Sequence, residues 1–373
     1  MVGIVQTKKN KDTLQIIGKG GLIICITLLF LISIDLIGAS FQLLSGSTAR
    51  SMLSVTANPF ISLFIGLLVT AIIQSSSTTT SMVVAMVGSG TLSLHHAIPI
   101  VMGANIGTTI TSTLVSLGYI TSKREFRKAI GAGSIHDFYN IILTIILFPL
   151  EYYYHVLSSV SSHIAHWVSP PFLHDTQGMQ PEAGIIPVNP IRDFLIEWID
   201  NSWVLLFLSF FVLFATIKIL SKIIYGSLIG KSREQLKKFI FRSPFSAFGW
   251  GTLLTATIQS SSLTTPLIVP LVATSKISLH KAFPYIIGAN IGTTVTALIA
   301  AFFNSEAAIS IAIVHFLFNL TGVVLFMPFA MLRNIPVGIA LRFGSLTMHN
   351  RLYGFLYIVL TFFILPFILI YFN

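Results

Sequence analysis

The chain has 373 residues, of which 54% are hydrophobic and 9% are charged, and its mean hydropathy is +0.86. This composition excludes an ordinary soluble domain and predicts an all-α, polytopic membrane protein whose solvent is the lipid bilayer. The net charge of +10 does not favour nucleic-acid binding, because Lys and Arg lie in short clusters between apolar spans, as they do in cytoplasmic loops. The single cysteine, Cys25, excludes an intramolecular disulfide and a thiolate metal site.

The N-terminal part predicts a tail followed by a retained helix. Residues 1–19 are polar and basic, so we expect a cytoplasmic tail, and 20–44 are apolar enough for a first transmembrane helix without a cleavage site. Residues 51–118 contain no Asp, Glu, Lys or Arg. Such segments are long enough to cross hydrocarbon about 30 Å thick.

An internal duplication dominates the sequence. Residues 70–111 return as 255–296 at a constant offset of 185, with 24 of 42 positions identical. Both copies contain Gln-Ser-Ser-Ser and, thirty-one residues after the Gln, an Asn within Gly-Ala-Asn-Ile-Gly-Thr-Thr. Two such copies in one chain are typical of a transporter built from structural repeats, with its site where the repeats meet.

Each copy interrupts an apolar stretch with polar residues, seven in a row at 74–80. A straight helix facing lipid does not tolerate this, because unpaired polar groups in hydrocarbon cost several kcal/mol each. We expect a re-entrant hairpin or broken helix at each Gln-Ser-Ser-Ser. The glycines that flank Asn105 and Asn290 further predict a discontinuous helix in each repeat.

A basic cluster at 123–128 marks a return to the cytoplasm, and 129–154 is predicted as a helix. Residues 156–200, rich in Pro, Asp and Glu, predict an exposed extracytoplasmic loop between the two halves. The helix expected at 202–225 then leads from outside to a basic, inner stretch.

The two transmembrane repeats, 20–155 and 201–332, are therefore entered from opposite sides. We expect them to be inverted about a pseudo-twofold axis in the membrane plane. Residues 333–373 predict a cytoplasmic connection, containing Arg333, Arg342 and Arg351, and a last transmembrane helix.

The duplicated motifs combine groups suited to an anion with groups suited to a cation. Ser hydroxyls, Gln amides and the N–H groups at a helix start favour a small oxyanion. The Asn and Thr oxygens of the second motif, with freed carbonyls, favour sodium. The residues assigned to the anion are Gln74, Ser75, Ser76, Ser77, Gln259, Ser260, Ser261 and Ser262.

The cation set extends beyond the duplicated stretch. Asp137 is an intramembrane carboxylate, which is costly and usually marks an ion path. The sodium candidates are Asn105, Thr108, Thr109, Asp137, Asn140, Asn290, Thr293 and Thr294. The accessory candidates are His136, His315, Asn319, Thr79 and Thr264, since His136 with Asn140 and His315 with Asn319 share a four-residue, one-face spacing.

Each candidate has a structural alternative. Ser and Thr in membrane helices often bond to their own backbone or allow helices to pack closely. The two histidines fit the core of a bundle equally well, and Asp137 lies only nine residues beyond Lys128, which leaves a snorkelling or structural role open.

At these residues the chain resembles the type II sodium-dependent phosphate cotransporters over about residues 20–370. The resemblance rests on both QSSS and both ANIGT segments, on EFRKAIGAGSIHDFYN with the following FPLE, on VHFLFN and on the late Leu-Pro. It implies an inverted-repeat symporter of inorganic phosphate and Na⁺ in the plasma membrane, with phosphate between 74–77 and 259–262. It also implies electrogenic transport, because an aspartate matching Asp137 distinguishes the family's electrogenic members.

The chain departs from the animal members of that family. Ala104 and Ala289 replace Ser, and Tyr119 and Ser122 stand where Gln and Asp often contribute to a sodium site, so the sodium ligands and stoichiometry stay open. The outer loop lacks cysteine pairs and Asn-x-Ser/Thr sites. This favours a bacterial or other microbial source, in which the inner membrane would hold the protein.

Other functions are weighed against this one. Sulfate or arsenate could replace phosphate as the anion. A channel would need carbonyls in series along a continuous pore, and an enzyme would need a Ser-His-Asp set or a carboxylate pair that these segments lack. We expect no cofactor, with Na⁺ as the coupling ion, and we expect phosphate, Na⁺ and the bilayer, but no nucleic acid, as partners. The oligomeric state stays open.

Overall fold

The computed structural model is helical throughout the residues that it describes, and it confirms an all-α membrane protein. These residues are 21–22, 24–37, 39–40, 43, 58–169, 189–199, 201–228, 239–302 and 304–372. Five helical stretches within them are long and apolar enough to cross a membrane, namely Leu94–Tyr119, Lys123–Tyr154, Leu279–Phe302, Glu306–Phe326 and Leu352–Tyr371. The predicted tail at 1–19 lies outside the described residues.

The first repeat consists of short helices separated by breaks. Helix α3 (Pro59–Ile73) and helix α4 (Ser76–Gly88) meet at Gln74 and Ser75. Helix α5 (Leu94–Gly107) is followed by α6 (Ile110–Ser116). Helices α3 and α5 pack so closely that a side chain at Gly103 would collide with the carbonyl oxygen of Leu63.

The second repeat has the same order of helices, but the segment after its Gln-Ser-Ser-Ser motif forms two helices instead of one. Helix α13 (Pro244–Ile258) precedes two short helices, α14 (Ser261–Thr264) and α15 (Ile268–Ala273). Pro266 stands where the first repeat has Ser81, and because proline lacks an N–H it divides what is a single helix α4 in the first repeat.

The prediction of a discontinuous helix around Asn290 is wrong. Helix α16 runs unbroken from Leu279 to Phe302. Its Gly288 and Gly292 do not break it, because they serve close packing instead: a side chain on either would strike the backbone of α13.

The segment 156–200 is also more regular than an exposed loop. Residues Val156–Val168 form α8 and Asn189–Trp198 form α10. Helix α8 forms because 156–168 contain no proline and place Leu157, Ser161 and Ala165 on one buried face. That face packs against α17.

Each repeat ends in a long helix, and a third long helix follows the second repeat. Helix α7 (Lys123–Tyr154) begins earlier than predicted because Ser122 caps it at the N–H of Glu125. Helix α17 (Glu306–Phe326) ends the second repeat. The predicted connection after residue 333 is largely helix α18 (Ala330–His349), which packs on α7.

The last span is interrupted once. Helices α19 (Leu352–Val359) and α20 (Leu365–Tyr371) flank a π-helical turn, Leu360–Ile364. Pro366 lies just after the turn and has no N–H to donate to the preceding turn, which favours this local widening.

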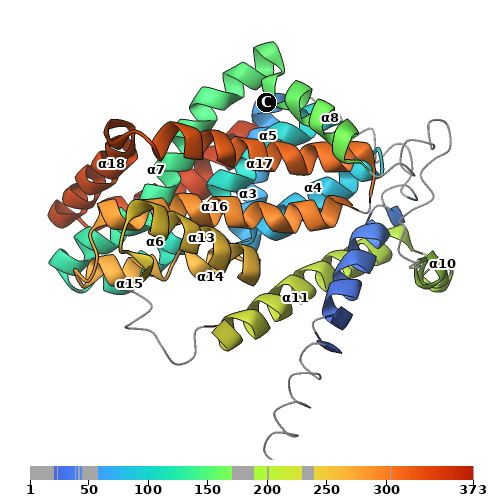
Figure 1. The fold of residues 1–373 in the computed structure, drawn as a ribbon, viewed down its shortest axis with the longest axis horizontal. Coiled ribbons are helices and arrows are strands. Elements are labelled where there is room, and N and C mark those ends of the chain that lie inside the picture. The colour runs from blue at the N-terminus through green and yellow to red at the C-terminus, as the bar shows by residue number, and fades with distance from the viewer. Residues whose placement is uncertain are drawn as a thin grey trace, which may run out of the picture.

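The halves interlock. Helix α4 of the first repeat packs against α16 and α17, and α15 of the second packs against α6 and α7. Figure 1 shows α16 and α17 side by side through the middle of the bundle, with α11 (Ser202–Leu228) at its periphery next to α13. The arm that follows each Gln-Ser-Ser-Ser motif therefore lies in the other half of the molecule.

The glycine contacts predict a stability effect. We expect Gly288→Ala to lower the melting temperature of the detergent-solubilised protein, because α13 and α16 must separate, at a cost of about 1–3 kcal/mol. Gly249→Ala on α13 is the matched control, since open space surrounds Gly249. Equal melting temperatures for both variants would contradict this close packing.

Candidate functional site

Each Gln of the two motifs ends a helix in the left-handed conformation. Gln74 has φ 57° and Gln259 has φ 56°. Their N–H groups donate to Thr70 and Thr255, both at 2.7 Å. Residues other than glycine seldom adopt this conformation, and the same break in the helix occurs at both copies.

The two motifs contact each other reciprocally. The hydroxyl of Ser77 donates to the carbonyl oxygen of Gln259 at 3.2 Å. The hydroxyl of Ser262 donates to the carbonyl oxygen of Gln74 at 2.7 Å. Residues more than 180 positions apart are thus joined at the ends of α3 and α13, whose last carbonyls lack partners within their own helices.

The remaining hydroxyls of the motifs shape this junction. Ser75 caps α4 by accepting from the N–H of Thr78 at 3.3 Å, whereas the side chain of Ser260 makes no such bond to α14. Ser76 and Ser261 are buried, while Gln74 is exposed. The junction therefore borders accessible space on one side and the protein interior on the other.

Two accessory threonines hold the helices on either side of each break. Thr79 bonds to Thr70 at 2.9 Å, and Thr264 bonds to Thr255 at 2.7 Å. The arrangement is the same in both copies. It gives Thr79, four residues after Ser75, and Thr264, four residues after Ser260, a structural role that requires no contact with a ligand.

Each duplicated Asn is held by the His and Asn pair of another helix. His136 and Asn140 of α7 bond to the side chain of Asn290, at 2.5 Å and 2.8 Å. His315 and Asn319 of α17 bond to Asn105 Oδ1, at 3.3 Å and 3.2 Å.

A further bond joins these two clusters into one. Asn140 Nδ2 donates to the carbonyl oxygen of Asn105 at 2.6 Å. All six side chains are buried. The bonds described here link amides, imidazoles and backbone, so this network contains many neutral oxygen atoms and no Lys or Arg.

The four threonines of the second motif bond to their own helices. Thr108 and Thr293 donate to the carbonyls of Ala104 and Ala289, at 2.8 Å and 2.9 Å. Thr109 and Thr294 each donate to a carbonyl three residues earlier, at 2.7 Å. Bonding to the backbone of their own helix is the structural alternative that the sequence analysis gave for these threonines. A hydroxyl oxygen that donates its proton still has lone pairs for a cation.

Asp137 lies apart from His136 and Asn140. Its carboxylate is buried and accepts from Tyr357 at 3.0 Å and from Thr113 at 3.2 Å. Thr113 and Tyr357 were missed by the sequence reasoning: Thr113 follows Thr109 by one helical turn, which is a weak signal, but nothing in the sequence relates Tyr357 on α19 to α7.

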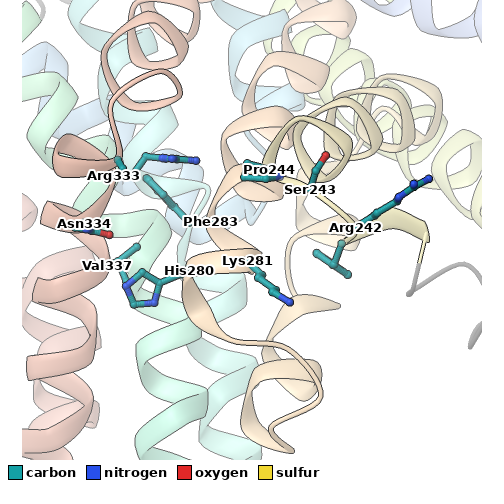
Figure 2. Close-up of a pocket in the computed structure, with 11 residues that line it drawn as sticks. Arg242, Ser243, Pro244, His280, Lys281, Phe283, Arg333, Asn334 and Val337 are labelled. Carbon is teal, nitrogen blue, oxygen red and sulfur yellow. The ribbon is translucent and has the colours of Figure 1, made fainter.

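A basic cavity of about 280 Å³ lies elsewhere, between the start of α13, α16 and α18. Figure 2 shows Arg242 from the α13 side, Lys281 from α16 and Arg333 from α18 around it. None of the predicted anion or sodium residues lines this cavity. Its positive potential attracts anions to this face of the protein.

Comparison with known proteins agrees with the motifs. Residues 29–158 and 212–350 match the family model described as Na+/Pi-cotransporter. The chain belongs to this family. Members of the Na+/Pi-cotransporter family are transporters and not enzymes, as the sequence predicted.

The curated relatives are sodium-dependent phosphate transport proteins. The chain is 28% identical to protein 2B of Pongo abelii over 94% of its length, 29% identical to protein 2B of Homo sapiens over 94%, and 30% identical to protein 2A of Ovis aries over 91%. It spans about 65% of the length of these relatives. No solved structure matches the chain.

Proposed function

We propose that this protein is a sodium-coupled symporter of inorganic phosphate. The observation that carries the proposal is the reciprocal contact between the two Gln-Ser-Ser-Ser motifs, in a chain that belongs to the Na+/Pi-cotransporter family. We further propose that the chain crosses the plasma membrane many times, with a cytoplasmic N-terminus and an extracytoplasmic segment at 156–200.

Phosphate is proposed to bind at the junction of the two motifs. Gln74 and Gln259 would donate from their amides, and Ser75 to Ser77 with Ser260 to Ser262 from hydroxyls, after the two cross-motif serines release the carbonyls that they now contact. The N–H groups at the start of α4 add partial positive charge. This proposal is supported by the exposure of Gln74 beside buried serines.

The duplicated stretches 70–111 and 255–296 contain no arginine, and their only lysines are Lys276 and Lys281, so we infer that sodium is a necessary part of this site. Phosphate carries about one to two negative charges at neutral pH, and neutral donors alone do not compensate a buried anion of that charge. Cations that enter with it remove this cost. Coupling follows because neither ion is stable in the site without the other.

Sodium is proposed to bind among the neutral oxygens that surround the phosphate site. The candidates are Asn105, Thr108, Thr109 and Asn140 from the first repeat and Asn290, Thr293 and Thr294 from the second. Asp137 is proposed to hold one further Na⁺, which is supported by its burial and by its contacts with the hydroxyl groups of Thr113 and Tyr357. His136, His315 and Asn319 would orient the amide groups of Asn290 and Asn105.

The two repeats are proposed to be inverted and to alternate access to this central site. The interlocked arms α4 and α15 support the idea, because each repeat contributes one wall of the junction. Rocking one repeat against the other would open the junction to one side at a time. The Na⁺ bound at Asp137 would make the loaded carrier move net positive charge.

The main test is uptake of radiolabelled phosphate into proteoliposomes. We expect accumulation only with an inward Na⁺ gradient, and poor substitution by lithium or potassium. Equal uptake in choline medium would contradict coupling to sodium. Uptake of sulfate in place of phosphate would refute the assigned anion, and a non-saturable current that reverses far from the sodium potential would indicate a channel.

A second prediction addresses the two-copy site. Gln74→Ala and Gln259→Ala should each abolish uptake while leaving the protein folded and in the membrane. Ser76→Ala and Ser261→Ala should weaken apparent phosphate affinity by about 1–3 kcal/mol, the cost of a lost buried partner. Thr257→Ala, an exposed change on α13, is the control. If only one Gln matters, the two motifs do not share one substrate.

A third prediction addresses electrogenicity. Asp137 has no acidic counterpart, because Phe316 occupies its place in the second half. We expect Asp137→Gly to transport phosphate with sodium but without a phosphate-induced current, since each charge moved is worth about 2.3 kcal/mol per 100 mV. Charge and phosphate fluxes are measured in the same vesicles. An unchanged charge-to-phosphate ratio would assign Asp137 a structural role.

A further inference from the structure

Three ligand-type side chains converge at one end of the bundle, away from the junction of the two motifs. His95 lies near the start of α5, Glu151 in the last turn of α7, and His155 in the link between α7 and α8. One potential ligand atom from each lies within 4.8 Å of the others. The imidazole rings of His95 and His155 have centroids 4.8 Å apart.

Glu151 is an unusual carboxylate. Its side chain is buried, with 3% of its surface exposed. Oε2 accepts from the N–H groups of Leu157 at 2.7 Å and Ser158 at 3.2 Å, so it caps the start of α8. Oε1 is buried and has no hydrogen-bond partner. None of the ion pairs formed by the described residues includes Glu151. A buried charged oxygen without a partner is costly, and a bound cation removes that cost.

The backbone holds His155 close to this oxygen. His155 has φ 53°, in the left-handed region, and its N–H donates to the carbonyl of Glu151 at 3.0 Å. A residue other than glycine in this conformation costs free energy, and such residues cluster at functional sites. The reversal from α7 to α8 places the imidazole of His155 next to that of His95.

We propose that His95, Glu151 and His155 form a binding site for a divalent transition metal ion of the zinc type. Two imidazole nitrogens and one carboxylate oxygen are a common ligand set for zinc, with a fourth position left for water. Ligand atoms around tetrahedral zinc lie about 3.3 Å apart, given bonds of about 2.0–2.1 Å. Rotation of the exposed His155 side chain closes the remaining gap.

The second repeat provides an internal contrast. His280 occupies the position of His95 at the offset of 185 residues. It lines the basic cavity of Figure 2 together with Arg242, Lys281 and Arg333, where positive charge disfavours a cation. The metal site is therefore specific to the first repeat, and it goes beyond the proposed transport of phosphate, which does not need it.

Exposed aromatic residues surround the site. Tyr153 and Tyr154 in the last turn of α7 and Trp167 at the end of α8 are exposed, as aromatic residues are at a membrane interface. A metal ion bound here would link the start of α5 to the corner between α7 and α8, and would stabilise the protein in proportion to its occupancy.

The test measures zinc binding to the purified full-length protein in detergent, after any affinity tag has been removed. Equilibrium dialysis against ZnCl₂ with elemental analysis counts bound ions, and thermal unfolding with and without ZnCl₂ measures stabilisation. We expect one zinc ion per chain that depends on these residues, and a rise in melting temperature on adding zinc. Phosphate and sodium are omitted, so the outcome is independent of transport.

The variants are chosen to preserve the fold. Glu151→Gln keeps an oxygen that caps α8, and His155→Asn keeps a residue that tolerates the left-handed conformation. His95→Gln is the third, and His280→Ala is the matched control. Each of the three should weaken zinc binding by more than about tenfold, because loss even of a group that only supports a ligand costs about 10–100-fold. No zinc bound by the wild type, or equal binding by all variants, would overturn the proposal.

Discussion

A bilayer offers no water to backbone groups at a helix break, so every break inside it needs partners from the protein. The breaks at Gln74 and Gln259 supply these hydrogen-bond partners to each other. Ser77 donates to the carbonyl oxygen of Gln259, and Ser262 donates to that of Gln74. Each motif thus satisfies a carbonyl that the other leaves without a partner, and these two bonds join the two halves of the molecule at the helix breaks.

The same reciprocity extends to the buried amides. Asn290 depends on α7, and Asn105 depends on α17, so neither repeat completes its own polar network. Asn140 then joins the two clusters. Such a network is strongly coupled, because removing one member leaves several buried groups unpaired. A binding site built there is held in position by both halves, and motion between them would change all its contacts together.

Close packing sets the limits of that motion. The glycines of α5 and α16 let their backbones contact α3 and α13 directly, so each repeat contains one closely packed pair of helices. The arms that follow the two motifs differ, since Pro266 separates α14 from α15 where the first repeat has the single helix α4.

The sequence by itself determined the membrane class, the duplication and the helix breaks at the two Gln-Ser-Ser-Ser motifs. These follow from local composition: polar residues in a row cannot face lipid, and an offset of 185 residues is visible without a structure. The family could also be identified from short sequence motifs.

Only the tertiary structure decided which residues meet. Glycines around Asn290 predict a break when read alone, but α16 is unbroken because those glycines contact α13, and residues 156–168 form a helix because α17 covers one face of them. The partner of Asp137 on α19 and the convergence of His95, Glu151 and His155 have no signal in the sequence. Contacts between residues so far apart depend on how the helices pack, and that packing is set by the whole chain.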